Sequence, residues 1–295
     1  MKKVIIAGGT GFIGQELIHR FEQNGYKVLI ISREAGNVLW SDKNELKSAL
    51  NDADLVLNLA GKSVNCRFTE KNKEALLSSR IITTKQLGEA IANCQLPPKL
   101  WINASGASIY PSDSTEVNTE DSSTNGKSFM AEVARQWEQT FFSFKLSATR
   151  QIALRVTLVL GKSGGVFPIF KKLAQFGLGG SVGSGNQKMS WIHIDDLYNI
   201  LLHLMAHPDI VGPVNCGAPH VPGNSEFMHS LRKTVGMPFG VPAPAFAIKF
   251  ASPVIDIEPS LLLDSMWVKP SVLEKSGYQF KFSELNSALK DLNNL

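Results

Sequence analysis

A glycine-rich turn near the N-terminus constrains the fold of this chain more than any other feature. The turn occupies residues 8–14 (GGTGFIG), after the β-branched run at residues 3–7 (KVIIA) and before helically spaced apolar residues at 11–24. In such a strand–turn–helix unit the first glycine permits a tight turn, Gly11 lets the backbone approach a pyrophosphate, and Gly14 lets the helix pack closely on the strand. The free N–H groups and positive dipole end of that helix bind phosphate. The turn therefore predicts a dinucleotide-binding site.

The first half of the chain repeats this alternation of short apolar runs and longer helical patterns. The predicted strands are residues 3–7, 27–31, 54–59, 100–104 and 151–160, and the predicted helices are residues 11–24, 42–50, 70–92 and 128–144. Continuous apolar runs are typical of strands buried on both faces of a parallel sheet, and repeated βαβ units have right-handed crossovers. We therefore expect an α/β fold with a doubly wound, parallel Rossmann sheet that binds ligands at the carboxyl ends of its strands.

The end of the second predicted strand indicates which dinucleotide is bound. Sites that prefer NAD carry Asp or Glu there, because a carboxylate binds the ribose hydroxyls. This chain has Ser32 and Arg33, and a guanidinium group binds the 2′-phosphate that a carboxylate would repel. The sequence therefore predicts NADP(H) as the cofactor. Glu34 leaves NAD(H) open if the strand ends later than expected.

The pattern changes after residue 160. Glycines gather at 177–185, the aromatic and polar run SWIHIDD occupies 190–196, prolines gather at 238–259, and a last amphipathic helix is predicted at 283–292. We expect an NADP-binding Rossmann domain at residues 1–160. Residues 161–295 are expected to form a smaller substrate lobe with a C-terminal extension, and some of its segments are expected to return to the Rossmann sheet.

Composition excludes several classes of protein. The net charge is only +4 and no basic run is present, so no nucleic-acid partner is expected. Three separated cysteines without a CxxC pair favour a reducing, cytoplasmic location. No apolar run approaches the ~20 residues that a bilayer requires, and no metal-ligand motif is present. We expect a cytoplasmic monomer or homodimer that acts on an unknown small molecule, without membrane partner or metal.

Further motifs make the chain similar to a known family. These are Asn58-Leu59-Ala60-Gly61 after the third predicted strand, Ser79-Arg80 in the long helix, and the run at 190–196. Together with the glycine turn, they resemble the extended short-chain dehydrogenase/reductases, and more narrowly an atypical branch, the NAD-dependent epimerase/dehydratase-like "epimerase family" proteins. The branch-specific C-terminal extension matches residues 268–292, so the resemblance covers nearly the whole chain.

The resemblance implies a Rossmann domain with a small substrate lobe and bound NADP(H). It also implies that Leu59 and Ala60 lie over the adenosine side of the dinucleotide, and that Arg80 contacts the cofactor. A helix arginine of this kind is as often simply solvated. The full set of predicted cofactor contacts is Gly8, Thr10, Gly11, Phe12, Ile13, Gly14, Ser32, Arg33, Leu59, Ala60, Gly61 and Arg80.

The catalytic triad of ordinary family members is missing from this sequence. In those enzymes a tyrosine transfers the proton, a lysine four residues later lowers its pKa, and a serine or threonine assists. No tyrosine here is followed four positions later by lysine. When the fourth helix is aligned through Trp137-Glu138, the tyrosine and lysine positions fall on Met130 and Ala134, and the serine position falls on Gly106. None of these side chains can transfer a proton.

Other side chains are candidates to replace the triad near the nicotinamide. His193 has the ordinary pKa closest to neutral, although a packed structural histidine explains it equally well. Tyr110 can serve catalysis or simply close the substrate lobe. Arg155 can bind an anionic substrate or pair with a buried carboxylate. The predicted catalytic residues are His193, Tyr110 and Ser105, with Lys127 and Arg135 as further candidates.

Two functions remain open. The first is an NADP(H)-dependent oxidoreductase or epimerase-like enzyme with a non-standard proton relay. The glycine-rich and aromatic segment at 177–191 favours this function, because it is typical of a small-molecule pocket beside the cofactor. The second is a non-catalytic NADP(H)-binding sensor or regulatory module, which the loss of the triad favours.

Overall fold

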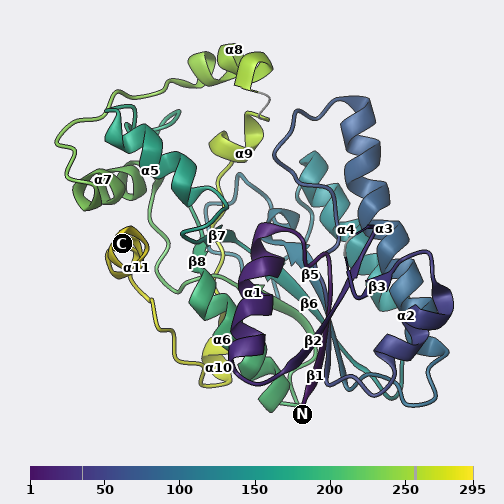
Figure 1. Cartoon of the computed structure of the whole chain (residues 1–295). Coiled ribbons are helices and arrows are strands. Elements are labelled where there is room, and N and C mark those ends of the chain that lie inside the picture. Colours follow the sequence, from purple (N-terminus) through teal and green to yellow (C-terminus); the bar gives the residue numbers. More distant parts are fainter. Residues whose placement is uncertain (35, 256–257, 295) are drawn as a thin grey trace.

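A seven-stranded parallel sheet forms the centre of the computed structural model, which describes residues 1–34, 36–255 and 258–294 (Figure 1). The strand order is β3-β2-β1-β4-β5-β6-β9, and every neighbouring pair is parallel. The order reverses between β1 and β4, which makes their carboxyl ends a ligand-binding switch point. The strands are β1 (Lys3–Ala7), β2 (Lys27–Ser32), β3 (Val38–Leu39), β4 (Leu55–Asn58), β5 (Leu100–Gly106), β6 (Arg150–Val156) and β9 (Gly212–Cys216).

Helices cover both faces of this sheet, because successive side chains of each strand point to opposite faces. Val4 and Ile6 of β1 belong to the apolar core under α1 (Phe12–Gln23) and α6 (Ile194–Ala206). Ile5 and Ala7 belong to the opposite core, which packs under α2 (Lys43–Leu50), α3 (Glu70–Ala92) and α4 (Phe129–Ser143). The prediction of a doubly wound Rossmann fold is therefore confirmed.

A smaller lobe lies beyond the carboxyl ends of the strands (Figure 1). Its own core contains Phe167, Trp191, Phe227 and Leu289. A two-stranded parallel sheet joins it to the Rossmann half. The lobe and its connections contain η1 (Ala107–Ile109), α5 (Phe167–Gln175), α7 (Asn224–Thr234), α8 (Ala245–Ile255), α9 (Ser260–Leu263), α10 (Ser271–Lys275), α11 (Leu285–Asn293), β7 (Leu158–Leu160) and β8 (Trp191–His193).

The strand predicted at 151–160 is in fact two strands in different sheets. The chain turns at Thr157, whose N–H and hydroxyl both donate to the Cys216 carbonyl. After the turn, β7 pairs with β8 instead of continuing beside β5. The chain later returns through α6 and β9, so residues 194–216 complete the Rossmann half although they lie beyond residue 160. Strand β3, which is only two residues long, was not predicted.

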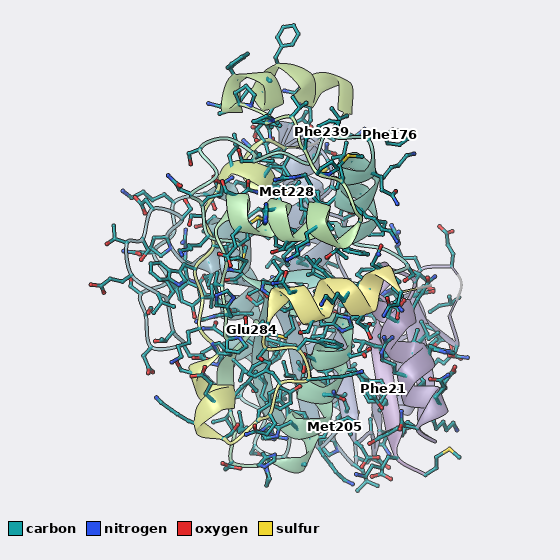
Figure 2. All side chains as sticks on the ribbon, turned by 90° about the vertical axis from the view of Figure 1, so that its left-hand side faces the viewer. Phe21, Phe176, Met205, Met228, Phe239 and Glu284 are labelled. Carbon is teal, nitrogen blue, oxygen red and sulfur yellow. The ribbon has the colours of Figure 1, made fainter. Side chains whose placement is uncertain are left out.

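A buried aspartate attaches the C-terminal extension to α6. Asp196 is 0% exposed, and its carboxylate accepts hydrogen bonds from the Tyr278 hydroxyl and from the N–H groups of Lys281 and Phe282. Burial of the ring, together with this carboxylate, raises the pKa of Tyr278 above its ordinary value. Figure 2 shows α11, which begins just after Glu284, beside α7. None of the described helices is long and apolar enough to cross a bilayer.

Candidate functional site

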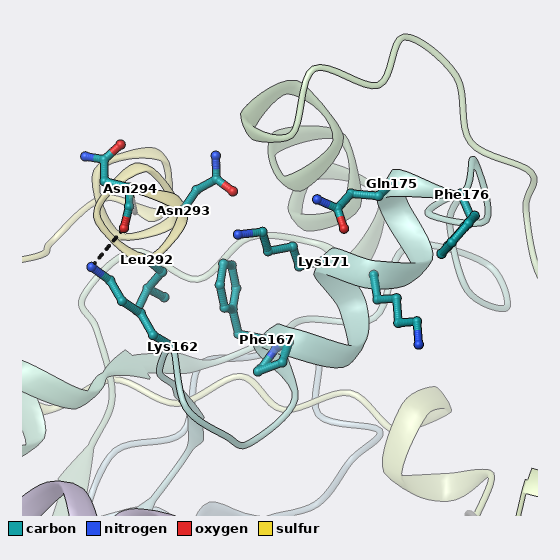
Figure 3. Close-up of a pocket in the computed structure, with 10 residues that line it drawn as sticks. Lys162, Phe167, Lys171, Gln175, Phe176, Leu292, Asn293 and Asn294 are labelled. Atoms are coloured by element: carbon teal, nitrogen blue, oxygen red, sulfur yellow. Dashed lines mark hydrogen bonds between the residues drawn. The ribbon is translucent and has the colours of Figure 1, made fainter.

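A cavity of about 1300 Å³ lies at the carboxyl edge of the sheet. Its wall starts at the glycine turn, includes the ends of β4 and β5, and continues to the segment around α9 and Val268. Ligand pockets usually measure roughly 300–1000 Å³, so this one has room for a dinucleotide and a second molecule. A smaller hollow of about 620 Å³, shown in Figure 3, lies between α5 and the end of α11 and contains no residue of the glycine turn.

The three key glycines of the turn serve different purposes. Gly8 has φ +82°, and a Cβ there would lie 2.7 Å from the Ala60 nitrogen. A Cβ at Gly14 would lie 2.6 Å from the Gly9 Cα, so both positions require glycine for the fold itself. Gly11 has ordinary extended angles, φ −79° and ψ 169°, and the nearest atom to a Cβ there would be 3.7 Å away. No neighbouring protein atom therefore requires glycine at this position, which lines the cavity.

The N-terminus of α1 is open toward this space. Gly11 is the N-cap and provides no side-chain hydrogen bond, and no acidic residue lies in the first turn. The next three residues of the helix, Phe12, Ile13 and Gly14, all line the cavity. Because the first N–H groups of a helix lack intrahelical partners, this end of α1 is suited to bind an anion.

A buried polar network shapes the turn after β4. The Asn58 side-chain oxygen accepts a hydrogen bond from the N–H of Ala60, and its amide donates to Thr84 and Asn103. The indole N–H of Trp137 donates to the same Thr84 hydroxyl. These bonds fix residues 58–61 against the glycine turn, where the main chain of Ala60 contacts Gly8.

Arg80 is a buried cation in the cavity wall. It is 9% exposed, it donates to the carbonyls of Lys62 and Leu76, and its guanidinium group lies 5.1 Å from the Trp137 ring. No carboxylate among the described residues forms an ion pair with it, and burial lowers the pKa of Arg80 to about 10. A buried cation without an anionic partner favours binding of an anionic ligand.

Arg33 lies directly after β2, which ends at Ser32. Ser32 is buried and Arg33 is exposed, as is Glu34. The strand therefore ends one residue later than predicted, and Arg33 is the first residue beyond it.

The cavity wall contains eight of the twelve predicted cofactor contacts. These are Gly8, Gly11, Phe12, Ile13, Gly14, Leu59, Gly61 and Arg80. The other four, Thr10, Ser32, Arg33 and Ala60, lie outside the lining. Thr10 and Arg33 are exposed, so they border open surface instead of enclosed space.

The three positions aligned with the family's triad all line the cavity. Gly106 is at the end of β5, and Met130 and Ala134 lie one turn apart near the start of α4. The wall at this point consists of a glycine, a thioether and a methyl group. It contains no group at these positions that can donate or accept a proton.

Two of the predicted catalytic residues, Tyr110 and Ser105, also line the cavity, but their hydroxyl groups are already bonded. Tyr110 donates to Asn215 at 2.9 Å and accepts from Arg155 at 2.7 Å. Ser105 donates to Glu138 at 2.7 Å. Burial raises the pKa of Tyr110 above its ordinary value despite the nearby guanidinium group.

Arg155 and Glu138 form the centre of this network. Two nitrogens of Arg155 each donate to an oxygen of Glu138 at 2.9 Å, and both side chains are buried. Of the two roles considered for Arg155, the structure shows pairing with a buried carboxylate. The pair connects β6 to α4 behind the cavity wall.

The third predicted catalytic residue, His193, lies outside the cavity lining. It is 1% exposed, its ring is 4.0 Å from the Phe282 ring, and its Nδ1 accepts a hydrogen bond from the N–H of Asp195 as the N-cap of α6. The structure thus gives His193 a helix-capping role. Lys127 lines the cavity but is exposed, whereas Arg135 forms an ion pair with Glu132.

Sequence reasoning missed the residues that enclose the far end of the cavity. They share an apolar character and come from loops and element ends, and they are Phe68, Phe129, Val133, Leu262, Met266 and Trp267. The only local signal was an apolar cluster at 261–267, directly after the proline-rich stretch at 238–259. Its position over the sheet depends on long-range pairing, such as the isolated β-bridge between Met266 and Met189.

The parallel sheet and the glycine turn at its switch point define the class of protein, a Rossmann-like α/β protein. A family model described as "NAD dependent epimerase/dehydratase family" matches residues 4–217, and a "domain of unknown function (DUF1731)" matches residues 243–292. The chain belongs to the NAD-dependent epimerase/dehydratase family, as the sequence motifs predicted.

Curated relatives match the chain from end to end. Epimerase family protein SSP1921 of Staphylococcus saprophyticus is 35% identical, with 99% of both chains covered. A crystal structure of human epimerase family protein SDR39U1 with NADPH has a TM-score of 0.90 and 32% identity, again with 99% of both chains covered. A nucleoside-diphosphate sugar epimerase from Corynebacterium glutamicum has a TM-score of 0.79 and 29% identity, covering 98% of this chain and 57% of that one.

Proposed function

We propose that this protein binds NADP(H) along the glycine turn and acts as an oxidoreductase or epimerase-like enzyme on a small molecule in the remainder of the cavity. The space over Gly11 is the observation that carries the proposal. Neither the backbone angles nor neighbouring protein atoms require glycine there, yet the residue lines the cavity at the N-terminus of α1. The similar human protein, whose crystal structure contains NADPH, supports the same cofactor.

The residues present fit this dinucleotide. The N-terminus of α1 would hold the pyrophosphate, Arg80 would supply a positive charge in the wall, and Arg33 would bind the 2′-phosphate. The nicotinamide, when bound, supplies hydride-transfer chemistry. Ser105 and Tyr110 line the cavity and remain the candidate groups for proton exchange with substrate. We do not extend that role to His193, which caps α6 outside the cavity.

A non-catalytic NADP(H) sensor is the second candidate function. It is favoured by the apolar groups at the aligned triad positions, Gly106, Met130 and Ala134. General acid–base catalysis typically contributes ~10²–10⁴-fold to a rate, and a sensor needs none of it. Steady NADPH oxidation with any small substrate would exclude this second function.

Substitution of Gly11 tests the cofactor site. We expect Gly11→Val to abolish NADPH binding measured by calorimetry while circular dichroism stays unchanged, because the added side chain clashes with no protein atom and would occupy the space proposed for the pyrophosphate. Gly223→Val is a matched control: Gly223 is also a helix N-cap with extended angles, φ −73° and ψ 160°, but it does not line the cavity.

The control should bind NADPH as the unsubstituted protein does. Normal NADPH binding by folded Gly11→Val would show that the glycine turn is not the cofactor site.

A further inference from the structure

Large apolar side chains are exposed at the outer end of the smaller lobe. Phe176 and Leu178 follow α5 and are 72% and 54% exposed. Phe239 and Val241 follow α7 and are 61% and 56% exposed. The two segments lie side by side, because the N–H of Val241 donates to the Gly177 carbonyl at 2.8 Å. Figure 2 shows Phe176 and Phe239 close together, below α8.

Helix α8 extends this exposed surface at the outer end of the lobe (Figure 1). Phe246 is 74% exposed and Phe250 is 87% exposed. The two residues lie one helical turn apart, so their rings share a face of the helix. We call the six exposed apolar residues the apolar tip: Phe176, Leu178, Phe239, Val241, Phe246 and Phe250. An exposed apolar patch of this kind marks an interaction site.

The charged residues of the segments that form the apolar tip are all basic. Residues 167–184 and 232–250 contain no Asp or Glu, and their basic residues are Lys171, Lys172, Arg232, Lys233 and Lys249. Lys172, Lys233 and Lys249 are exposed. The tip therefore combines apolar rings with exposed positive charge.

The acidic residues that adjoin these segments along the chain do not cancel this charge. Glu226 lies in the first turn of α7, at the other end of the helix from Lys233. Glu258 and Asp264 line the cavity. Asp256 lies outside the described residues.

We propose that the apolar tip binds the surface of an anionic lipid bilayer. The exposed rings enter the boundary between headgroups and acyl chains, and the basic side chains lie against the negative headgroups. A second copy of the chain fits this surface less well. A symmetric contact between two tips would bring the same positive charges face to face without an acidic partner.

This contact requires no membrane-spanning segment. The sequence-based expectation that the protein has no membrane partner rested on the lack of an apolar run of ~20 residues, which concerns spanning helices. The proposal is also independent of the cofactor site, because no residue of the apolar tip lines the cavity.

Co-sedimentation of the full-length protein with lipid vesicles tests the proposal. We expect binding to vesicles of equal parts phosphatidylcholine and phosphatidylglycerol, and about tenfold weaker binding to pure phosphatidylcholine vesicles. Absence of binding to the anionic vesicles, or equal binding to both, would overturn the proposal.

Substitutions in α8 test whether the exposed rings contact the lipid. Phe246→Ser combined with Phe250→Ser should weaken binding to the anionic vesicles by about tenfold or more. Ile82→Ser combined with Leu96→Ser is the matched control, because these side chains are 55% and 59% exposed but lie on α3 and just after it. The control should bind as the unsubstituted protein does.

Substitutions in α5 test the basic side chains. Lys171→Gln combined with Lys172→Gln removes two positive charges beside Phe176 and should also weaken binding by about tenfold. Lys71→Gln combined with Lys85→Gln removes two exposed charges from α3 instead, and should have little effect.

Circular dichroism and NADPH calorimetry should give the same result for all four variants as for the unsubstituted protein, so that a loss of vesicle binding reports on the surface alone. Undiminished vesicle binding by the Phe246 and Phe250 variant would show that the apolar tip does not contact lipid. Analytical ultracentrifugation without vesicles tests the alternative occupant. Self-association that this variant abolishes would assign the tip to an interface between copies and overturn the proposal.

Discussion

At the scale of single residues, Arg33 is the residue that we expect to set the choice between the two nicotinamide cofactors. It is exposed and follows the last residue of β2, where an NAD-preferring site would carry a carboxylate. A charge-assisted hydrogen bond contributes roughly 1.5–3 kcal/mol, so Arg33→Ala should weaken NADPH binding by about 10- to 150-fold and leave NADH binding nearly unchanged. Calorimetric titration with both cofactors measures the difference.

Glu34→Ala is the control for this prediction, since Glu34 is the neighbouring exposed charge. It should alter neither titration appreciably. Equal losses of NADPH and NADH affinity in Arg33→Ala would remove Arg33 from the 2′-phosphate site. A selective loss of NADH affinity in Glu34→Ala would assign the ribose contact to Glu34 instead.

Residue roles could be predicted where the reason for them is local. The glycine turn was recognisable because its strand and helix adjoin it in the sequence, and the cavity does begin there. Hydrogen-bond partners could not be predicted in the same way. Tyr110 bonds to Asn215 and Arg155, and Ser105 bonds to Glu138, all through tertiary contacts between separate elements.

At the scale of elements, the cap of α6 makes the stability of the protein depend on pH. Protonation of His193 at Nδ1 would remove the acceptor for the Asp195 N–H, and the ring is buried against Phe282. Burial lowers the pKa of His193 from 6.5, although Asp195 and Asp291 lie nearby. The folded state therefore binds fewer protons than the unfolded state as the pH falls below that value.

We expect the full stabilisation from His193 to be present above pH 6.5 and to decrease as the pH falls toward the lowered pKa. Urea unfolding at about pH 7.5 and about pH 5.5 measures this change. His193→Asn keeps an N-cap acceptor that does not titrate, so it should lose less stability on acidification. If the free energy of unfolding falls by the same amount on acidification in both proteins, His193 does not contribute to the pH dependence.

The limits of element prediction are clearest around Thr157. No glycine or proline interrupts residues 151–160, so they were predicted as one strand. Thr157 bonds to Cys216 of β9, and this contact separates β6 from β7. By contrast, α3 was predicted with its observed ends; in the structure Thr69 caps its first turn by accepting a hydrogen bond from the Asn72 N–H.

At the scale of the whole molecule, Asp196 holds the C-terminal extension to the Rossmann half. Asp196→Ala would remove the side-chain acceptor of three donors, the Tyr278 hydroxyl and two N–H groups; two of these hydrogen bonds are buried and the one from Lys281 is partly buried. We expect it to reduce the free energy of unfolding by about 3–5 kcal/mol. Thermal or urea unfolding monitored by circular dichroism measures the loss.

The neighbouring Asp195 provides the control. Its half-buried carboxylate forms ion pairs with Arg20 and Lys281, so Asp195→Ala should cost at most about 1 kcal/mol. A loss in Asp196→Ala no larger than that in Asp195→Ala would show that the extension is attached mainly by other contacts, such as the packing of α11 on α7.

The overall architecture was predictable for the first half of the chain, where each strand is followed by the helix that covers it. The return of residues 194–216 to the sheet was expected only in outline. The pairing of β9 with β6 joins residues about sixty positions apart, such as Ile152 and Gly212. No periodicity within either segment specifies that partner.

The contribution of the C-terminal extension to the cavity has a consequence for how the family diversifies. Residues 243–292, matched by the domain of unknown function, include Met266 and Trp267 in the wall, whereas the glycine turn and Arg33 lie in the part matched by the epimerase model. On the proposed function, cofactor choice and part of substrate choice would be encoded in separate stretches of the sequence. Replacing the extension with that of a relative is then expected to change the substrate and leave the cofactor unchanged.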